Sequence, residues 1–258
     1  MMRFLFFSLL FLVSVSVTAS NKTIVVAGDN WCPINCGADD EDKGFMIDVA
    51  TEALALSGYQ VKYEEIPWTR AVGLARKGNI NAIVGAFRGD APDFHFPNMA
   101  LLNISPSSLF VKKESTWQYQ TVRSFNGIRL GAIKGYDYGD ELNNYIQSVL
   151  ASDESSIVQI YGNDAVSRSI QFLLRDRIDV FVETGPVFWY QAKQMGISEQ
   201  VKPAGNVSEP EPCFIAFSPS LENSEALTLA LDKGIISLKQ QGRIKQIAKK
   251  YGLPIDSL

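Results

Sequence analysis

Short apolar runs alternate along this chain with longer segments in which apolar residues recur every three or four positions. The short runs predict strands, and the longer segments predict amphipathic helices. The predicted strands cover residues 23–27, 61–66, 82–87, 108–111, 128–132, 157–161, 178–182 and 213–217. Strands that alternate with helices are typical of parallel βαβ units, so we expect an α/β fold.

Glycine and threonine residues mark where several of the predicted helices begin and end. Residues 46–54 place their apolar side chains on one face, and Gly58 follows at a position typical of a helix C-terminus. Thr69 is placed to cap a second helix, which Gly78 ends. The segment 244–251 has the clearest helical repeat of the chain.

Two polar stretches, residues 112–116 and 204–212, interrupt the alternation. The second is rich in proline and glycine, as expected of a linker. We therefore expect one lobe formed by residues 21–112 plus 210–258 and another formed by residues 113–209. A chain that crosses twice between two lobes predicts a two-stranded hinge and closure of the lobes over a ligand.

Residues 1–20 are predicted to be a cleaved signal peptide. Arg3 precedes the apolar run 4–13, and residues 17–19 suit a cleavage site. A membrane anchor is the alternative, but the run is shorter than the roughly 20 residues that span a bilayer. We therefore expect an exported protein.

The charge and cysteine content narrow the choice of partners and cofactors. The formal net charge is −4 without a basic stripe, which argues against nucleic acid or an anionic membrane surface as a partner. In an exported protein, Cys32 and Cys36 are placed to form a disulfide beside Trp31, which would leave Cys213 as a free, buried thiol. A metal site is the alternative, but one CxxxC motif and a single histidine, His95, support it weakly. We expect no cofactor.

A series of short motifs follows in a fixed order: Trp31-x-Pro33, Gly44-Phe-Met-Ile-Asp48, Pro67-Trp68-Thr-Arg70-Ala71, Gly78-Asn-Ile-Asn-Ala82, Phe94-His-Phe96-Pro97, Asn126-Gly-Ile-Arg-Leu-Gly-Ala-Ile-Lys-Gly135 and Asp176-Arg-Ile-Asp179-Val. In this order they resemble the bacterial extracellular solute-binding proteins of family 3, the periplasmic receptors for polar amino acids and related solutes. The resemblance covers nearly all of the chain after the signal peptide. It implies two α/β lobes, each a mostly parallel sheet flanked by helices, with the ligand between them and two strands as the hinge. It also implies a monomer in the periplasm.

The resemblance implies an aromatic clamp in the cleft. The family places aromatic residues where Trp31 and Trp68 stand, with their rings facing the ligand. Such rings contribute apolar area, and their π-faces attract cationic groups. The alternative is that one of the two indoles belongs to the core of its lobe.

The expected anchor for an amino acid carboxylate is altered. Where the family has an arginine, this chain has Asp93. Arg88 is predicted to supply a guanidinium for a carboxylate or phosphate instead, unless it is a solvated surface residue. Arg70, which lies near Trp68 in the sequence, is a second candidate.

The expected anchor for the amine is altered as well. The family's aspartate corresponds to Thr184, so the preceding residue, Glu183, is the predicted partner of a ligand ammonium. A shift of one residue in a strand reverses the side-chain direction, which leaves this assignment open. Tyr136 and Asp137 follow Gly135 where the family's loop supplies hydrogen bonds, or they form an ordinary turn.

These residues predict a non-enzymatic protein that captures a small polar solute by hinge closure. The solute is amino acid-like, an amine or a modified small molecule, and its delivery to the permease of an ABC transporter is the expected function. A receptor that feeds a membrane signalling protein is the alternative. A dehydratase-type enzyme on the same scaffold is less favoured, because the predicted pocket has no histidine, nucleophile elbow or metal set.

Overall fold

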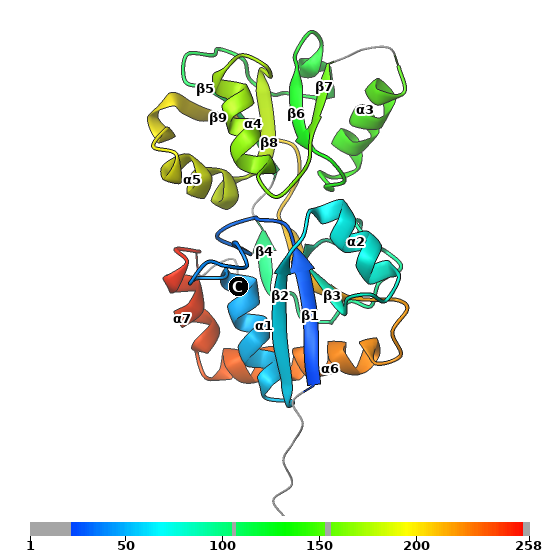
Figure 1. Cartoon of the computed structure of the whole chain (residues 1–258). Coiled ribbons are helices and arrows are strands. Elements are labelled where there is room, and N and C mark those ends of the chain that lie inside the picture. Colours follow the sequence, from blue (N-terminus) through cyan, green and yellow to red (C-terminus); the bar gives the residue numbers. More distant parts are fainter. Residues whose placement is uncertain (1–21, 105–106, 153–155, 255–258) are drawn as a thin grey trace, which may run out of the picture.

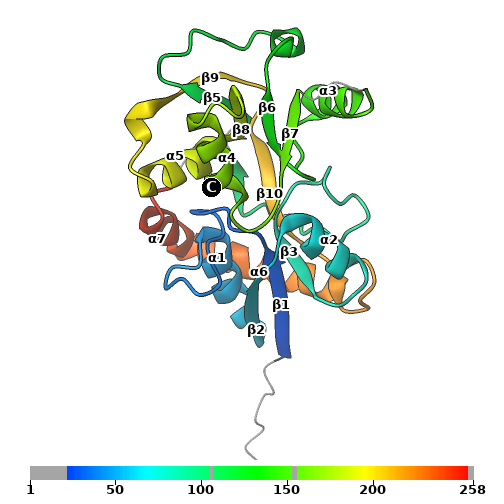
Figure 2. The same cartoon turned by 45° about the horizontal axis from the view of Figure 1, so that its top comes forward.

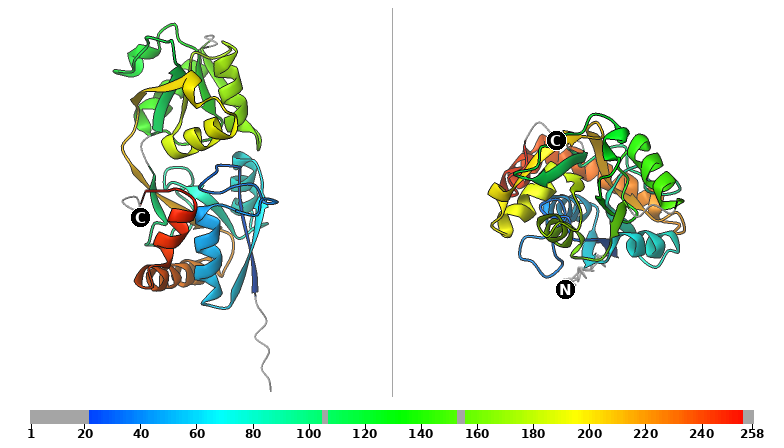
Figure 3. Two further views of the ribbon diagram at one scale, coloured as in Figure 1. Left: turned by 90° about the vertical axis from the view of Figure 1, so that its left-hand side faces the viewer. Right: turned by 90° about the horizontal axis from the view of Figure 1, so that it is seen from above.

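The computed structural model describes residues 22–104, 107–152 and 156–254, so the predicted signal peptide lies outside the described residues. The described chain forms two sheets of five strands each, flanked by seven α-helices. Figure 1 shows the sheets in two lobes, one above the other. The left view of Figure 3 shows the same separation, and Figure 2 shows the long strand β10 (Glu211–Phe217) running between the two lobes.

The first lobe is built on a sheet with the strand order β2-β1-β3-β10-β4. Its strands besides β10 are β1 (Lys22–Gly28), β2 (Tyr59–Glu65), β3 (Ala82–Ala86) and β4 (Leu102–Ile104). Strand β1 runs parallel to β2 and β3, whereas β10 runs antiparallel to β3 and β4. The carboxyl end of β1 points toward the second lobe (Figure 1), so the loop that follows β1 reaches the boundary between the lobes.

Four helices cover the first sheet: α1 (Phe45–Ala55), α2 (Trp68–Arg76), α6 (Ser224–Gln240) and α7 (Arg243–Lys250). Helices α1 and α6 share a core with alternate residues of β1, such as Ile24 and Val26, while α2 packs with Ala27 from the other face. This alternation follows from the strand geometry, in which successive side chains point to opposite faces.

The second lobe has the strand order β7-β6-β8-β5-β9. Its strands are β5 (Ser107–Lys112), β6 (Leu130–Ile133), β7 (Ile157–Ile160), β8 (Val180–Thr184) and β9 (Val201–Asn206). Helix α3 (Asp140–Leu150) shares a core with one face of this sheet, and helices α4 (Ala165–Leu174) and α5 (Gly185–Gln194) share a core with the other. Two 3₁₀ turns, η1 (Val122–Phe125) and η2 (Ser198–Gln200), complete the lobe.

The eight predicted strands are present with shifted ends, but β4 and β9 were not predicted. Both sheets are mixed, with parallel and antiparallel pairs, rather than mostly parallel. The antiparallel pairs arise where β5 and β10 bring the chain into a lobe from the opposite lobe. Strand β5 pairs with β8 and β9, so residues 107–112 lie with the second sheet and not, as predicted, with the first.

The helix starts differ from the prediction at one point. Helix α2 begins at Trp68 with Pro67 as its N-cap residue, and Thr69 does not cap it. The Thr69 hydroxyl instead donates to the carbonyl of Lys134 at 3.3 Å, across the boundary between the lobes. Gly58 and Gly78 both have positive φ angles, which glycine adopts without steric cost.

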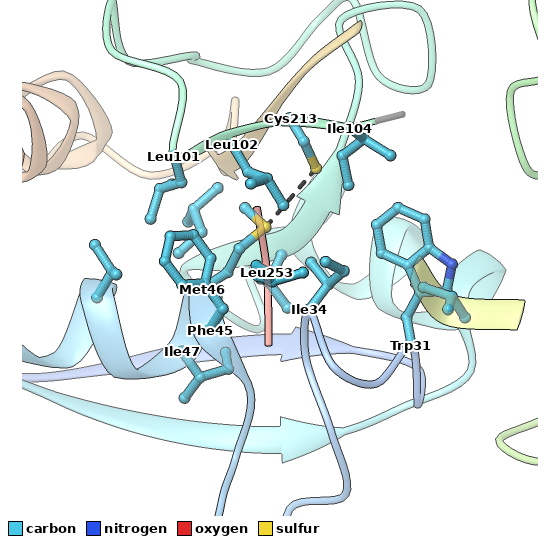
Figure 4. Close-up of a cluster of buried hydrophobic side chains, with 14 of the residues drawn as sticks. Trp31, Ile34, Phe45, Met46, Ile47, Leu101, Leu102, Ile104, Cys213 and Leu253 are labelled. Atoms are coloured by element: carbon cyan, nitrogen blue, oxygen red, sulfur yellow. Dashed lines mark hydrogen bonds between the residues drawn. The ribbon is translucent and has the colours of Figure 1, made fainter. Parts of the chain in front are cut away.

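The remaining thiol, Cys213, is buried in the core of the first lobe, where its sulfur faces the sulfur of Met46 at 3.8 Å (Figure 4). Burial raises the pKa of this thiol well above its ordinary value, so it is held as the uncharged, unreactive form. None of the helices in the described ranges has the length and apolar character needed to cross a bilayer.

Candidate functional site

A small cavity lies where the two lobes meet. It has a volume of about 20 Å³, which is room for roughly one water molecule. Most of its wall comes from the first lobe, and the second lobe contributes the loop after β6. The lining residues are Asp29, Trp31, Trp68, Val84, Gly85, Phe87, Asp90, Tyr136 and Asp137.

Trp31 is held by the tightly closed loop that follows β1. Its backbone N–H donates to the carbonyl of Asn35 at 2.8 Å, and Cys32 and Cys36 form a disulfide across the same turn. The Asn35 side chain in turn donates to the carbonyl of Asp29 at 2.6 Å. These links fix the indole at the end of β1, where only 4% of Trp31 is exposed.

Trp68 reaches the cavity because it is the first residue of α2, directly after the second strand–loop unit. Its indole N–H donates to the carbonyl of Gly135 in the second lobe at 2.9 Å. The indole is 94% buried by this contact and by the helix, so it belongs to the boundary between the lobes.

Tyr136 extends from the second lobe to lie between the two indoles. Its ring centre is 6.3 Å from that of Trp31 and 6.2 Å from that of Trp68, and it is nearly perpendicular to both. Such edge-to-face contacts are favourable between aromatic rings. The Tyr136 hydroxyl donates to Oδ2 of Asp29 at 2.6 Å, which is a short bond that again joins the lobes.

Glu183 is buried at the end of β8, with 1% of its surface exposed. Its Oε1 accepts hydrogen bonds from the Trp31 indole N–H at 2.9 Å and from the Thr184 backbone N–H at 2.7 Å. Within the described part of the chain, Glu183 Oε2 and Thr184 Oγ1 have no hydrogen-bond partner. Burial raises the pKa of Glu183 to about 8, against the lowering effect of these two donors.

Two aspartates of the first lobe are also kept from ionising readily. Burial raises the pKa of Asp29 to about 6, although the bond from Tyr136 opposes the shift. Burial raises the pKa of Asp90 to about 8, and the charge of Asp137 across the boundary adds to the shift. Burial therefore favours the protonated forms of Asp90 and Glu183.

Wider hollows adjoin the cavity on two sides. One, of about 340 Å³, shares Asp29 and Trp68 with the cavity and is also lined by Arg70 and Lys134. The other, of about 270 Å³, shares Asp90, Tyr136 and Asp137. The cavity therefore lies between two wider hollows with which it shares wall residues.

The predicted site residues fall into three groups. Trp31, Trp68, Tyr136 and Asp137 line one cavity, and Glu183 and Thr184 lie behind Trp31. Arg70 is exposed and lines the adjoining hollow. Arg88 does not line the cavity.

The Arg88 guanidinium is engaged within the first lobe. It lies 5.0 Å from the centre of the Phe96 ring and 4.7 Å from that of Phe214, and it donates to the carbonyl of Pro97 at 3.3 Å. Asp93, at the position of the expected carboxylate anchor, forms a two-pronged ion pair with Arg76 on the surface.

The predicted site residues leave out several lining residues, namely Asp29, Val84, Gly85, Phe87 and Asp90. Asp29 and Asp90 follow the carboxyl ends of β1 and β3, which is where ligands bind in open α/β sheets. The position after a strand end was the signal in the sequence for these two residues. The approach of Asp29 and Asp90 to the second lobe, however, could not be predicted from it.

A search among curated proteins gave no match. Solved structures with the same fold include an ancestral arginine-binding protein bound to arginine, with 19% sequence identity and a TM-score of 0.72, covering 90% of this chain and 98% of that one. A histidine kinase sensor domain with similarity to periplasmic binding proteins has 16% identity and a TM-score of 0.71, covering 90% and 95%. A substrate-binding protein of an ABC uptake transporter from Streptococcus pneumoniae, with bound histidine, has 21% identity and a TM-score of 0.71, covering 90% and 93%.

These likenesses establish the two-lobed fold. The family model for bacterial extracellular solute-binding proteins, family 3, matches residues 24–254, which span both lobes. The resemblance that the motifs indicated is therefore confirmed, and the chain belongs to the bacterial extracellular solute-binding proteins of family 3.

Proposed function

We propose that this chain is an exported substrate-binding protein that encloses a small polar solute between its lobes and delivers it to a membrane transporter. Membership of the solute-binding family supports the first part, and the transporter-associated binding proteins among the structural neighbours support the second. The work of such a protein is to capture and release a solute, and we propose no catalytic step.

The observation that carries the proposal is that three hydrogen bonds from aromatic side chains cross the lobe boundary around one cavity. Trp31 donates to Glu183, Trp68 to Gly135, and Tyr136 to Asp29. Side chains that meet in this way depend on how far the lobes are closed. A solute that contacts both sides would therefore favour the closed form, because it interacts differently with the open and closed states.

The path of the chain supports a hinge. The chain passes from the first sheet to the second between β4 and β5, and it returns between β9 and β10. Two connections at one boundary allow the lobes to rotate about a common axis while each sheet stays intact. In this proposal Trp31, Trp68 and Tyr136 form the walls of the binding site.

A sensory function is the second candidate. One structural neighbour is a histidine kinase sensor domain with similarity to periplasmic binding proteins, so this fold also occurs in a signalling protein. The two readings differ in the membrane partner. Crosslinking in the native host followed by mass spectrometry would recover a permease in the first case and a kinase or cyclase in the second.

The binding proposal can be tested by fluorescence and scattering. The chain has four tryptophans, and Trp117→Phe with Trp189→Phe leaves Trp31 and Trp68 as reporters. Bacterially exported protein would be titrated with amino acids, amines, organic acids, sugars and short peptides. We expect one class to change the emission and to reduce the radius of gyration in small-angle X-ray scattering.

The bound solute, released by denaturation and weighed by mass spectrometry, should be unchanged. Recovery of a converted product would overturn the non-enzymatic assignment. Failure of every class to alter emission, scattering or thermal stability would overturn the binding function itself.

A further inference from the structure

We propose that the solute is an organic cation, an amine recognised by aromatic rings and carboxyl groups, and that it needs no carboxylate of its own. This inference rests on the proposed binding function and names the chemical class of the ligand. Two observations support this inference. The indole and phenol donors of the cavity wall already have partners in the protein, and the residues that line the cavity include no lysine or arginine.

The indole and phenol donors in the cavity wall are all used within the protein. The indole N–H groups of Trp31 and Trp68 and the hydroxyl of Tyr136 each donate to a protein oxygen at 2.6–2.9 Å. The remaining lining side chains are apolar or carboxylic. A ligand carboxylate in this cavity would therefore lose its water without gaining a charged donor, which is strongly unfavourable.

The cationic side chains that could reverse this conclusion lie elsewhere. Arg88 is stacked against Phe96 and Phe214 and bonded to a backbone carbonyl. Arg70 and Lys134 line the adjoining hollow, which shares Trp68 and Asp29 with the cavity, but they do not line the cavity itself. An α-amino acid places its carboxylate beside its ammonium, so both groups would have to share the acidic cavity.

Carboxyl groups approach the cavity from both lobes. Asp90 accepts the backbone N–H of Phe87 at 2.8 Å, while Asp137 accepts the N–H of Gly139 and the amide of Asn143 at 2.9 and 2.6 Å. Burial and the Asp137 charge raise the pKa of Asp90 to about 8. An ammonium between these carboxyls would favour the ionised form of Asp90 beside Asp137, and the resulting opposite charges would compensate the loss of water.

The aromatic wall suits the same ligand. Trp31, Trp68, Phe87 and Tyr136 place four rings around the cavity. The faces of such rings carry partial negative charge and attract ammonium groups, and the attraction increases when water is excluded. On the second lobe next to Trp31, the buried Oε2 of Glu183 lacks a partner within the described residues and adds a further acceptor beside this wall.

Matched pairs of solutes test the inference directly. Each pair contains an amino acid and the amine that remains when its carboxylate is removed: arginine and agmatine, histidine and histamine, tyrosine and tyramine, lysine and cadaverine. Isothermal titration calorimetry on the exported protein should show at least one amine binding about tenfold or more tightly than its amino acid, because the acid carries an unpaired charge into the cavity.

An amino acid that binds as tightly as its amine, or more tightly, would overturn the inference and leave the binding function standing. If no solute of these pairs or of the wider panel binds, the binding function falls, and this inference falls with it. Binding of amino acids that is lost in Arg70→Ala would also overturn the inference, because the carboxylate would then reach the adjoining hollow.

Variants of two nearby aspartates provide the second test. Asp90→Asn should weaken amine binding by about tenfold to a hundredfold, since it removes a charge-assisted hydrogen bond. Asp93→Asn is the control, because its carboxyl lies on the surface and pairs with Arg76. Thermal unfolding checks that both variants are folded. Equal amine affinity in the wild type and in folded Asp90→Asn would contradict the proposed role of the carboxyls.

Discussion

Replacing Glu183 by glutamine removes an ionisable group from the lobe boundary while keeping an oxygen that accepts the Trp31 indole N–H. The carboxyl is 99% buried, and the burial is completed by Trp31 from the opposite lobe. Ionisation of Glu183 is therefore unfavourable as long as the lobes stay closed. In the unfolded chain or in an opened cleft, the same carboxyl would be hydrated and would titrate near its ordinary pKa.

The magnitude follows from the pKa of about 8 in the folded protein against the ordinary value of 4.5. Because the folded pKa is the higher one, the folded state binds this proton more tightly. Its contribution to stability is complete below about pH 4.5 and is lost as the pH rises toward 8. Each pH unit in this window costs about 1.4 kcal/mol, so Glu183 should remove about 3–4 kcal/mol between pH 5 and pH 8.

Urea unfolding of the wild type, Glu183→Gln and the exposed control Glu199→Gln at pH 5 and pH 8 measures this difference. We expect the stability advantage of Glu183→Gln over the wild type to grow by about 3–4 kcal/mol at the higher pH. Asp29 and Asp90 also have raised pKa values and add to the pH dependence of the unfolding free energy. Because all three proteins contain both residues, this contribution is common to them and does not enter the comparison.

The wild type has a second way to hydrate Glu183, which is to open the cleft without unfolding. X-ray scattering at both pH values detects this route as a larger radius of gyration at pH 8 in the wild type and not in Glu183→Gln. If unfolding and scattering change with pH in the same way in both proteins, the reasoning about the buried carboxyl is wrong.

Two further changes test the lobe contact and the loop that holds the first indole. A methyl group on Gly89 would overlap Oδ2 of Asp137, so Gly89→Ala should hinder closure and reduce solute affinity by about tenfold, as measured by calorimetry. Gly73→Ala, in a helix with open space around the added methyl, should keep the affinity and stabilise the fold by about 0.5–1 kcal/mol; equal affinities in the two variants would refute the contact. Replacing Cys32 and Cys36 by serine should lower the unfolding free energy by about 2 kcal/mol in urea, as expected for a short loop; an unchanged midpoint would show that the hydrogen bonds suffice.

The elements of the fold could be predicted wherever burial left a pattern in the sequence. Strand β3 is a run of small and apolar residues and β8 begins with three apolar residues, as central strands require because both faces are covered. Strand β4 has only three residues, and β9 contains Pro203 and Gly205, so neither produced a recognisable strand pattern. Both are edge strands of their sheets, where proline is tolerated because one row of N–H groups needs no partner.

The site was less predictable because it is made by two lobes that are distant in the sequence. Trp31 and Trp68 could be found, since large aromatic residues at strand ends are conspicuous there. The pairing of Tyr136 with Asp29 depends on how the lobes meet, which no local pattern encodes. Arg88 lies near the end of a strand, as predicted, but its side chain stacks on Phe96 and Phe214. The direction of a side chain after a strand end depends on its neighbours in space, which the local sequence does not specify.

Tyr136 occupies the space between the two indoles, so this side chain competes with the solute for the binding site. A guest that occupies that space must first displace the phenol and the bond that it donates to Asp29. A hydrogen bond to a charged group contributes about 1.5–3 kcal/mol, so the apparent affinity would be about ten to a hundred times weaker than the intrinsic one. Substitutions at position 136 therefore remove this competing contact and one wall of the site together, so the net change in affinity measures which of the two contributes more.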